Sequence, residues 1–380
     1  MSRTKTILAL LLTAALLVLP AAAAGPEVPA KGAILMEKTT GEVLWSQDGD
    51  AVLAPASVTK VMTLLLIMEA VDSGRLGYDD MIPVSATAAG MGGSQVYMEE
   101  GEQFSVRDML KAIAVASGND ACVAMAEHLA GTEAEFVARM NARAAELGMA
   151  DTQFMNCTGL PAEGHRTSAH DIAVMSRALI LDHPDVRAFT TIWMDSLRGG
   201  AFQLSNTNKL IRFYDGATGL KTGSTDEALY CLSATAEREG MELIAVILGA
   251  PTSAERFEAA KTVLNYGFAG WALVPVAPSE PLPDLPVSLG VDPSVPIGLG
   301  EDRSLLLAKA DAGKVTTTVD LPDALAAPVE AGAQVGTLTV LVDGQERATL
   351  PLVAGAACEK LSLWQIWRGV LLDLFCGAQP

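Results

Sequence analysis

Ser57 and Lys60 are the first pair of side chains in the chain that could carry out a reaction. They stand three residues apart at the start of an apolar run, so on a helix the hydroxyl and the amine lie on one face. A buried lysine amine loses its hydration, its pKa falls, and the neutral amine can then take the proton of a serine hydroxyl. A serine near a helix start is also a common N-cap, so the pair alone fits a structural turn equally well.

Two further polar motifs interrupt apolar segments. Ser117-Gly118-Asn119 offers a second hydroxyl and an amide that can hold a peptide carbonyl. Lys221-Thr222-Gly223, followed by Ser224, offers a positive field, a glycine that lets a substrate backbone approach, and a next backbone N–H that can donate to an oxyanion. Taken singly, the first motif fits a helix-capping turn and the second a strand-edge lysine. Their order and spacing, taken with Ser57 and Lys60, favour a functional set.

The segments around these motifs predict helices packed on one sheet. Strand-like runs at 33–37 and 42–46 begin the domain, and apolar strands at 228–236 and 241–249 follow the last motif. The segment 57–71 is apolar on nearly every side, which predicts a buried helix. Strands at both ends with helices between them predict a sheet assembled from both ends of the chain. Further helices are expected over Val106–Ala116, Asp120–Leu129, Glu133–Leu147, Ala169–Leu181 and Glu255–Gly267.

A second domain is predicted after Trp271, where the composition changes. Seven prolines fall between Pro275 and Pro296, and short apolar runs follow. Asp343-Gly344 between two such runs is a strong hairpin signal. We therefore expect a catalytic domain over 25–273 and a small all-β domain over 274–357.

The tail, residues 358–380, is predicted to hold an amphipathic helix. Between 361 and 376 the apolar residues, two tryptophans among them, share one broad face, and Ser362, Gln365, Arg368 and Asp373 share the other. The segment is short for a membrane span and typical of a helix that lies on a membrane surface. A helix packed on the protein itself, or a dimer contact, is the alternative.

The first 24 residues have the pattern of a secretory signal peptide. Arg3 and Lys5 precede an apolar run over 7–19, and small residues follow up to Ala24. An uncleaved N-terminal anchor is the alternative. We expect an exported protein at the outer face of the cytoplasmic membrane, in the cell wall or in the periplasm.

Charge and cysteine content exclude several classes of protein. The chain carries 26 basic and 45 acidic residues, a formal charge of −19, which argues against a nucleic-acid partner. Five cysteines without a CxxC pair fit neither a disulfide scaffold nor structural zinc, and the four histidines lack the HExxH motif of a zinc peptidase. No metal or cofactor is expected. Cys122, one helical turn beyond Asn119, is expected to make turnover sensitive to thiol reagents.

The three motifs together are the signature of class A β-lactamases and penicillin-binding proteins. Because the middle motif is Ser-Gly-Asn, the chain resembles the low-molecular-mass penicillin-binding proteins that are D-alanyl-D-alanine carboxypeptidases. The resemblance implies an α/β (α+β) fold, an antiparallel sheet packed with helices. It also extends to Ala54-Pro55-Ala56, Thr158-Gly159-Leu160, Asn206-Thr207-Asn208 and Ala327-Pro328-Val329.

The resemblance also implies a role for each catalytic residue. Ser57 would be the acylated nucleophile and Lys60 its base. Ser117 would relay a proton towards the leaving amine, Asn119 would position the peptide, and Lys221 would set the positive field.

The remaining implied residues would bind substrate. The backbone N–H groups of Ser57 and Ser224 would form the oxyanion hole next to Gly223. Thr222 and Arg256 would bind the terminal carboxylate of the peptide. Ser224 departs from the family pattern, because many relatives have histidine there, and Leu229-Tyr230 replaces the usual glycine after Ala228.

The function implied is a serine D-Ala-D-Ala carboxypeptidase that trims peptidoglycan pentapeptides and binds β-lactam antibiotics covalently. A β-lactamase is one alternative, although the chain shows no clear counterpart of the deacylating glutamate of class A. A non-catalytic wall-binding scaffold is another, and the intact Ser/Lys/Ser/Lys set speaks against it.

Overall fold

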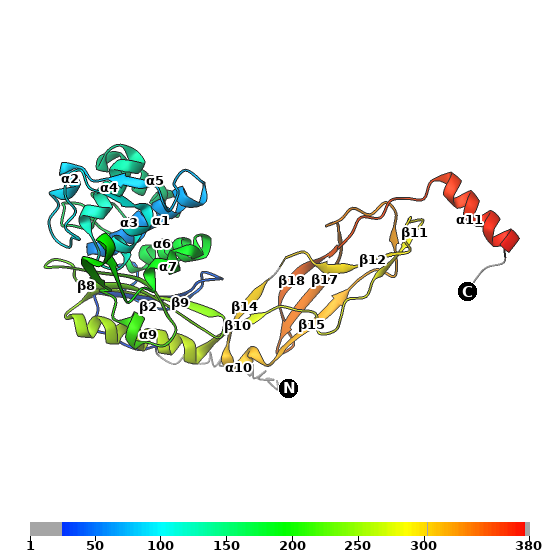
Figure 1. Ribbon diagram of the computed structural model, residues 1–380. Coiled ribbons are helices and arrows are strands. Elements are labelled where there is room, and N and C mark those ends of the chain that lie inside the picture. The colour runs from blue at the N-terminus through cyan, green and yellow to red at the C-terminus, as the bar shows by residue number, and fades with distance from the viewer. Residues whose placement is uncertain (1–24, 302, 377–380) are drawn as a thin grey trace, which may run out of the picture.

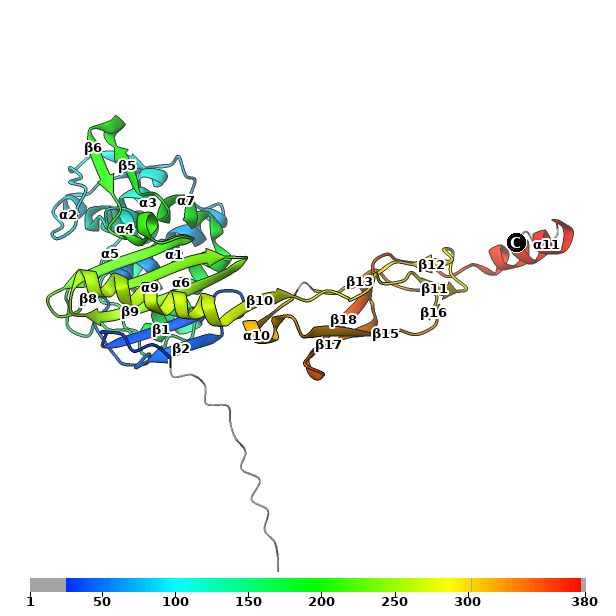
Figure 2. The same ribbon diagram turned by 90° about the horizontal axis from the view of Figure 1, so that it is seen from below.

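The computed structural model of the protein describes residues 25–301 and 303–376. Figures 1 and 2 show a helix-rich body at one end, a slender β domain extending from it, and a helix at the far end. The expected signal segment 1–24 lies outside the described residues.

The body contains a five-stranded antiparallel sheet with the strand order β2-β1-β9-β8-β7. β1 from the start of the chain pairs directly with β9 from the other end of the domain, which confirms the prediction of a sheet built from both ends. The strands are β1 (Gly32–Glu37), β2 (Val43–Gln47), β7 (Ala217–Thr225), β8 (Leu229–Arg238) and β9 (Met241–Ala250).

Helices cover both faces of this sheet. Side chains alternate between the faces of a strand, so Ile34 and Val246 pack against the helical body while Leu35 and Ile247 pack against α9 (Ser253–Gly270). Figure 2 shows α9 running along the sheet. Burial on both faces explains why β9 is apolar throughout except for Glu242, which pairs with Lys38 and Arg187.

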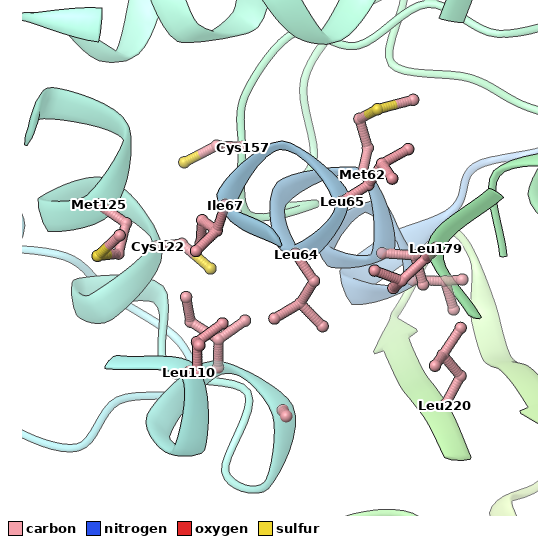
Figure 3. Packing of buried hydrophobic residues seen from close by; sticks show 14 of the residues in the cluster. Met62, Leu64, Leu65, Ile67, Leu110, Cys122, Met125, Cys157, Leu179 and Leu220 are labelled. Carbon is pink, nitrogen blue, oxygen red and sulfur yellow. The ribbon is translucent and has the colours of Figure 1, made fainter. Parts of the chain in front are cut away.

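Helix α1 (Lys60–Asp72) lies at the centre of the body. Figure 3 shows apolar side chains from α3 (Val106–Ala114), α4 (Asn119–Ala130) and α6 (Ala169–Asp182) surrounding it. This confirms the buried helix predicted from its apolar sequence. Its first turn differs from the prediction, because Ala56–Thr59 forms a 3-10 turn (η1) that precedes the α-helix.

Serine and threonine side chains cap the N-termini of four of the longer helices. Each hydroxyl accepts a hydrogen bond from a backbone N–H three residues further on, which satisfies a donor that the helix leaves free. The four N-cap residues are Ser105, Thr132, Ser168 and Thr252.

One further long helix of the body, α5 (Glu133–Glu146), was predicted. The remaining elements of the body are short and were not predicted. They are β3 (Met81–Pro83), α2 (Ala86–Ala89), β4 (Gln103–Ser105), η2 (Pro184–Val186), α7 (Arg187–Thr190), β5 (Met194–Leu197), η3 (Arg198–Gly200), β6 (Phe202–Ser205) and α8 (Leu210–Phe213).

The second part of the chain is built from strands. Asp343 and Gly344, both with positive φ, join the two long strands β17 (Gln334–Val342) and β18 (Gln345–Ala354), which confirms the predicted hairpin. Its strands are β10 (Trp271–Pro275), β11 (Leu285–Ser288), β12 (Ser294–Val295), β13 (Ile297–Leu299), β14 (Ser304–Ala308), β15 (Val315–Asp320), β16 (Leu325–Ala326), β17 (Gln334–Val342) and β18 (Gln345–Ala354), with a short helix α10 (Lys309–Ala312).

The tail forms the expected helix, α11 (Leu363–Cys376). Four of its apolar side chains, Leu363, Trp364, Trp367 and Val370, are exposed; Leu363 is 87% exposed and Trp364 is 66% exposed. In the described ranges, no helix combines the length and the apolar character needed to cross a membrane.

Gly267 tests the packing of α9 on the sheet. A Cβ at this position would lie 2.5 Å from Leu243 Cδ1 and 2.7 Å from Leu35 Cδ2. Gly267→Val should therefore lower the free energy of unfolding by about 1–3 kcal/mol, measured by urea denaturation. Gly270→Val is the matched control, because nothing lies within 4 Å of its Cβ. Equal effects of the two substitutions would contradict this packing.

Candidate active site

The three polar motifs meet where α1, the α3–α4 turn and strand β7 converge. Ser57 lies in η1 and Lys60 is the first residue of α1. Ser117 and Gly118 precede α4, which begins at Asn119. Lys221 lies in the middle of β7, the edge strand beside η1.

The amine of Lys60 is completely buried and contacts three oxygens. Its Nζ lies 3.0 Å from Ser57 Oγ, 2.7 Å from Asn119 Oδ1 and 2.7 Å from the Thr158 carbonyl. The Asn119 amide is oriented because its Nδ2 donates to the Gly92 carbonyl. Two of the three oxygens can only accept, whereas the Ser57 hydroxyl can donate. A neutral amine, with two hydrogens and one lone pair, satisfies all three contacts.

Electrostatics also favour a neutral amine in this site. Burial lowers the pKa of Lys60. Burial lowers the pKa of Lys221 well below its usual range, and the nearby charge of Lys60 lowers it further. Two buried amines so close together disfavour protonation of both. The lowered pKa of Lys60 favours its neutral form, which a general base requires.

Ser117 is held in a strained conformation. Its φ of 63° lies in the left-handed region, which is costly for residues with a Cβ. Its hydroxyl is buried and has no hydrogen-bond partner among the described residues. Strain and an unsatisfied buried hydroxyl both occur at sites where a bound molecule completes the contacts.

Strand β7 supplies the opposite wall of the site. Lys221 Nζ donates to the Thr222 carbonyl at 2.9 Å, and Thr222 Oγ1 donates to Thr207 Oγ1 at 2.7 Å. The sequence indicated Thr207 only as part of a family motif, without a role of its own. In the structure its hydroxyl contacts Thr222 at the site. Asn208 anchors this loop to β7, because its Nδ2 donates to the Gly219 carbonyl at 2.7 Å.

Gly223 is required for a reason that the sequence did not reveal. A Cβ there would lie 2.8 Å from the Ser57 nitrogen and 2.9 Å from the Val58 nitrogen. The glycine therefore lets β7 approach the chain's own backbone at η1. Ser224 is the next residue along β7 after this close approach. The Ser224 residue itself is exposed.

The loop over 154–166 forms a third wall that spacing alone did not predict. Thr158 provides the carbonyl that contacts Lys60. Gly159, with φ of 84°, lies so close to η1 that a Cβ would be 1.9 Å from the Ala56 carbonyl oxygen. Both residues lie in a motif that carries the family resemblance, and the structure shows the contacts that each makes.

Arg256 lies at the start of α9 and is buried. One guanidinium nitrogen donates to the carbonyls of Gly223 and Cys231, at 3.1 and 3.2 Å, and the other donates to Ser253 Oγ. Burial lowers the pKa of Arg256 to about 10, so the side chain stays charged at neutral pH. These contacts tie the guanidinium to the end of β7 and to the start of β8.

Comparison with known proteins identifies the family. The D-alanyl-D-alanine carboxypeptidase family model matches residues 20–252, and that of the penicillin-binding protein 5 C-terminal domain matches residues 276–360. The chain belongs to the D-alanyl-D-alanine carboxypeptidase family. It is a serine-type hydrolase of cell-wall peptidoglycan peptides and a low-molecular-mass penicillin-binding protein, as the sequence motifs predicted.

Alignments with similar proteins extend over most of the length of this carboxypeptidase. D-alanyl-D-alanine carboxypeptidase DacF of Bacillus subtilis is 43% identical over 86% of this chain and 85% of its own length. DacC of Escherichia coli is 32% identical over 91% of this chain and 89% of its own. The crystal structure of penicillin-binding protein 6B from Escherichia coli has a TM-score of 0.72 and 30% identity, over 88% of this chain and 98% of that one. These likenesses confirm the predicted fold class.

One residue that departs from the expected family pattern, Leu229, has a strained backbone conformation in the carboxypeptidase. Leu229, at a position where the resemblance leads us to expect glycine, has φ of 56°. That left-handed conformation favours glycine and costs other residues about 1 kcal/mol. The strain lies at the start of β8, next to β7 but outside the group of catalytic side chains.

Cys122 is less exposed than its spacing suggested. Its side chain is completely buried in the carboxypeptidase, on the face of α4 that meets α1 (Figure 3), and burial raises its pKa to about 12. Thiol reagents react with the thiolate, so Cys122 is protected at neutral pH. Both facts argue against the expected sensitivity to thiol reagents.

Gly159 offers a test of the close contact at η1. Gly159→Ala should reduce the acylation rate of the carboxypeptidase by penicillin about a hundredfold, because the added methyl group displaces the Ala56–Ser57 backbone. Gly131→Ala is the matched control, since Gly131 has the same φ of 84° but open space around its Cβ. Both variants carry backbone strain, so stopped-flow acylation rates at equal folded fraction isolate the clash. Similar rates in the two variants would contradict the assigned contact.

Proposed function

We propose that Ser57 is the nucleophile of the carboxypeptidase and that Lys60 is its general base. The observation that carries this proposal is the buried Lys60 amine, 3.0 Å from Ser57 Oγ and held by two obligate acceptors. The lone pair of the neutral amine accepts the hydroxyl proton as Ser57 Oγ attacks the carbonyl between the two D-alanines.

The developing negative charge requires donors that are already in place. The backbone N–H groups of Ser57 and Ser224 form this oxyanion hole, which the close approach at Gly223 supports. Collapse of the tetrahedral intermediate breaks the peptide bond and leaves an ester on Ser57. The departing D-alanine amine takes the proton that Lys60 accepted, relayed by Ser117, and Lys60 is neutral again. Water then hydrolyses the ester and regenerates the hydroxyl.

Selectivity for a free C-terminus rests on the wall formed by β7. The hydroxyls of Thr222 and Thr207 can donate to the terminal carboxylate. Lys221 contributes a positive field from within the protein, and Arg256 contributes its charge while it holds the Gly223 carbonyl. Asn119 positions the peptide on the opposite side. Arg256 is proposed to bind the terminal carboxylate together with Thr222, as the resemblance implies.

The same chemistry explains reaction with β-lactam antibiotics. Attack by Ser57 opens the β-lactam ring and leaves a penicilloyl ester, and no leaving amine diffuses away. An ampicillin-bound structure is known for penicillin-binding protein D2 of Listeria monocytogenes, which is 34% identical over 64% of this chain. The proposed partners are peptidoglycan pentapeptides ending in D-Ala-D-Ala and β-lactams, with no cofactor.

We further propose that the tail holds the enzyme at a membrane. The domain division is 25–273 for catalysis, 274–357 for the β domain and 358–380 for the anchoring tail. The exposed Trp364 and Trp367 rings stack at 5.2 Å on the apolar side of α11. The signal pattern at 1–24 supports export, so the membrane face is the outer one.

Mass spectrometry after benzylpenicillin addition tests the nucleophile. A single penicilloyl adduct is expected on Ser57, absent from Ser57→Ala and retained in Ser73→Ala, a control at the far end of α1. Lys60→Ala should slow acylation about a hundredfold or more, the usual contribution of a general base. An adduct on another residue would refute the assignment of Ser57, and rapid acylation of Lys60→Ala would refute the assigned base.

Vesicle co-sedimentation tests the tail. Full-length enzyme should bind anionic or neutral vesicles and stay bound in high salt, because apolar burial dominates over charge. Replacing Trp364 and Trp367 together by serine should release the enzyme, whereas replacing Gln365 and Arg368 by serine, on the polar face, should not. Release of the unaltered enzyme by salt would contradict apolar anchoring.

A further inference from the structure

His165 is a buried histidine next to the nucleophilic turn that the mechanism above does not use. It is 8% exposed, and its Nε2 lies 2.9 Å from Thr59 Oγ1. Thr59 is completely buried, and its hydroxyl donates to the Ala56 carbonyl at 2.8 Å. The ring is therefore connected to the residue before Ser57 through one hydroxyl group.

The contacts determine the tautomer of His165. Because the Thr59 hydroxyl donates its only hydrogen to the Ala56 carbonyl, its oxygen must accept from the histidine, so Nε2 carries the hydrogen. Nδ1 then accepts from the Met155 N–H at 3.4 Å. Burial lowers the pKa of His165 to about 4, so this neutral form persists at neutral pH.

The Ala56 carbonyl needs such support because the turn around it is strained. Ala56 has φ of 48°, a conformation that residues with a Cβ rarely adopt. Gly159 lies close to the same carbonyl, since a Cβ on it would be 1.9 Å from the carbonyl oxygen. The Ala56 carbonyl belongs to the peptide unit whose nitrogen is the Ser57 N–H, so a rotation of this unit would turn that N–H away from the oxyanion.

We propose that His165 is a positioning residue that acts through Thr59 to hold the Ala56–Ser57 peptide unit in the orientation required for acylation. This inference rests on the proposed role of Ser57. It adds a second function to the loop that carries Thr158. In this loop Thr158 supports the base, Lys60, and His165 supports the nucleophile and its oxyanion donor.

Four substitutions separate hydrogen bonding from packing. His165→Phe keeps an aromatic ring against Phe154, its T-shaped neighbour at 6.0 Å, but removes the donor. His165→Gln retains an N–H donor near the position of Nε2. Thr59→Val removes the hydroxyl with little change in shape, and Thr59→Ser retains it. His128→Phe, on an exposed position of α4, is the control for a histidine-to-phenylalanine change elsewhere.

The rate of penicilloyl-adduct formation is measured at a temperature where every variant is folded, together with kcat and KM for a D-Ala-D-Ala peptide. His165→Phe and Thr59→Val should acylate about tenfold to a hundredfold more slowly, with kcat lowered and KM little changed. His165→Gln and Thr59→Ser should recover most of the rate, and His128→Phe should match the wild type. The double variant His165→Phe/Thr59→Val should be no slower than the slower single variant, because both remove one coupled contact.

Three results would overturn the inference: wild-type acylation in His165→Phe, no recovery in His165→Gln, or additive losses in the double variant. Should His165→Phe fail to fold, His165→Leu takes its place in the comparison with His165→Gln. Labelling of the wild type away from Ser57 would instead refute the proposed function. Labelling at Ser57 with unaffected His165 variants would refute this inference alone.

Discussion

A lysine amine can lie in a protein interior only where each of its polar contacts is satisfied, and the site is built around this condition at Lys60. Its two obligate acceptors, Asn119 and the Thr158 carbonyl, are 59 and 98 residues away in the sequence. Helix α1 must therefore be enclosed by α4 on one side and by the 154–166 loop on another. The apolar surface of α1 on all sides makes that enclosure favourable. Burial of the helix also lowers the pKa of the amine it carries.

The main chain around the nucleophile is crowded and strained, and its surroundings keep it so. Ala56 and Ser117 both adopt left-handed conformations. Such conformations cost about 1–3 kcal/mol each and persist where packing over-determines them. Gly159 and Gly223 approach the η1 backbone from two directions, at distances that no side chain would permit. The oxyanion donors proposed for the carboxypeptidase are thus positioned by backbone contacts as much as by hydrogen bonds.

Several parts of the molecule could be predicted from local sequence because local forces decide them. Hydrophobic periodicity predicted the buried helix α1, and Asp343-Gly344 predicted the hairpin of the β domain, since a type I′ turn needs two residues that accept positive φ. The 3-10 turn η1 was not predicted, because long-range contacts with β7 and with Gly159 determine its conformation. The strands of the two short sheets in the body, β3-β4 and β5-β6, have too few residues for an alternation of apolar and polar side chains to be recognised.

The sequence by itself determined which chemical groups are available, because a hydroxyl, an amine or an amide belongs to a residue type that can be read directly. It determined their order along the chain, and with that order the family and its reaction. Only the tertiary structure decided which main-chain groups complete the site, among them the Thr158 carbonyl that contacts Lys60. Every residue carries a carbonyl, so its type does not show which carbonyl will be used. The roles of Thr207 and His165 were likewise decided by packing, because their partners, Thr222 and Thr59, become neighbours only when distant segments fold together.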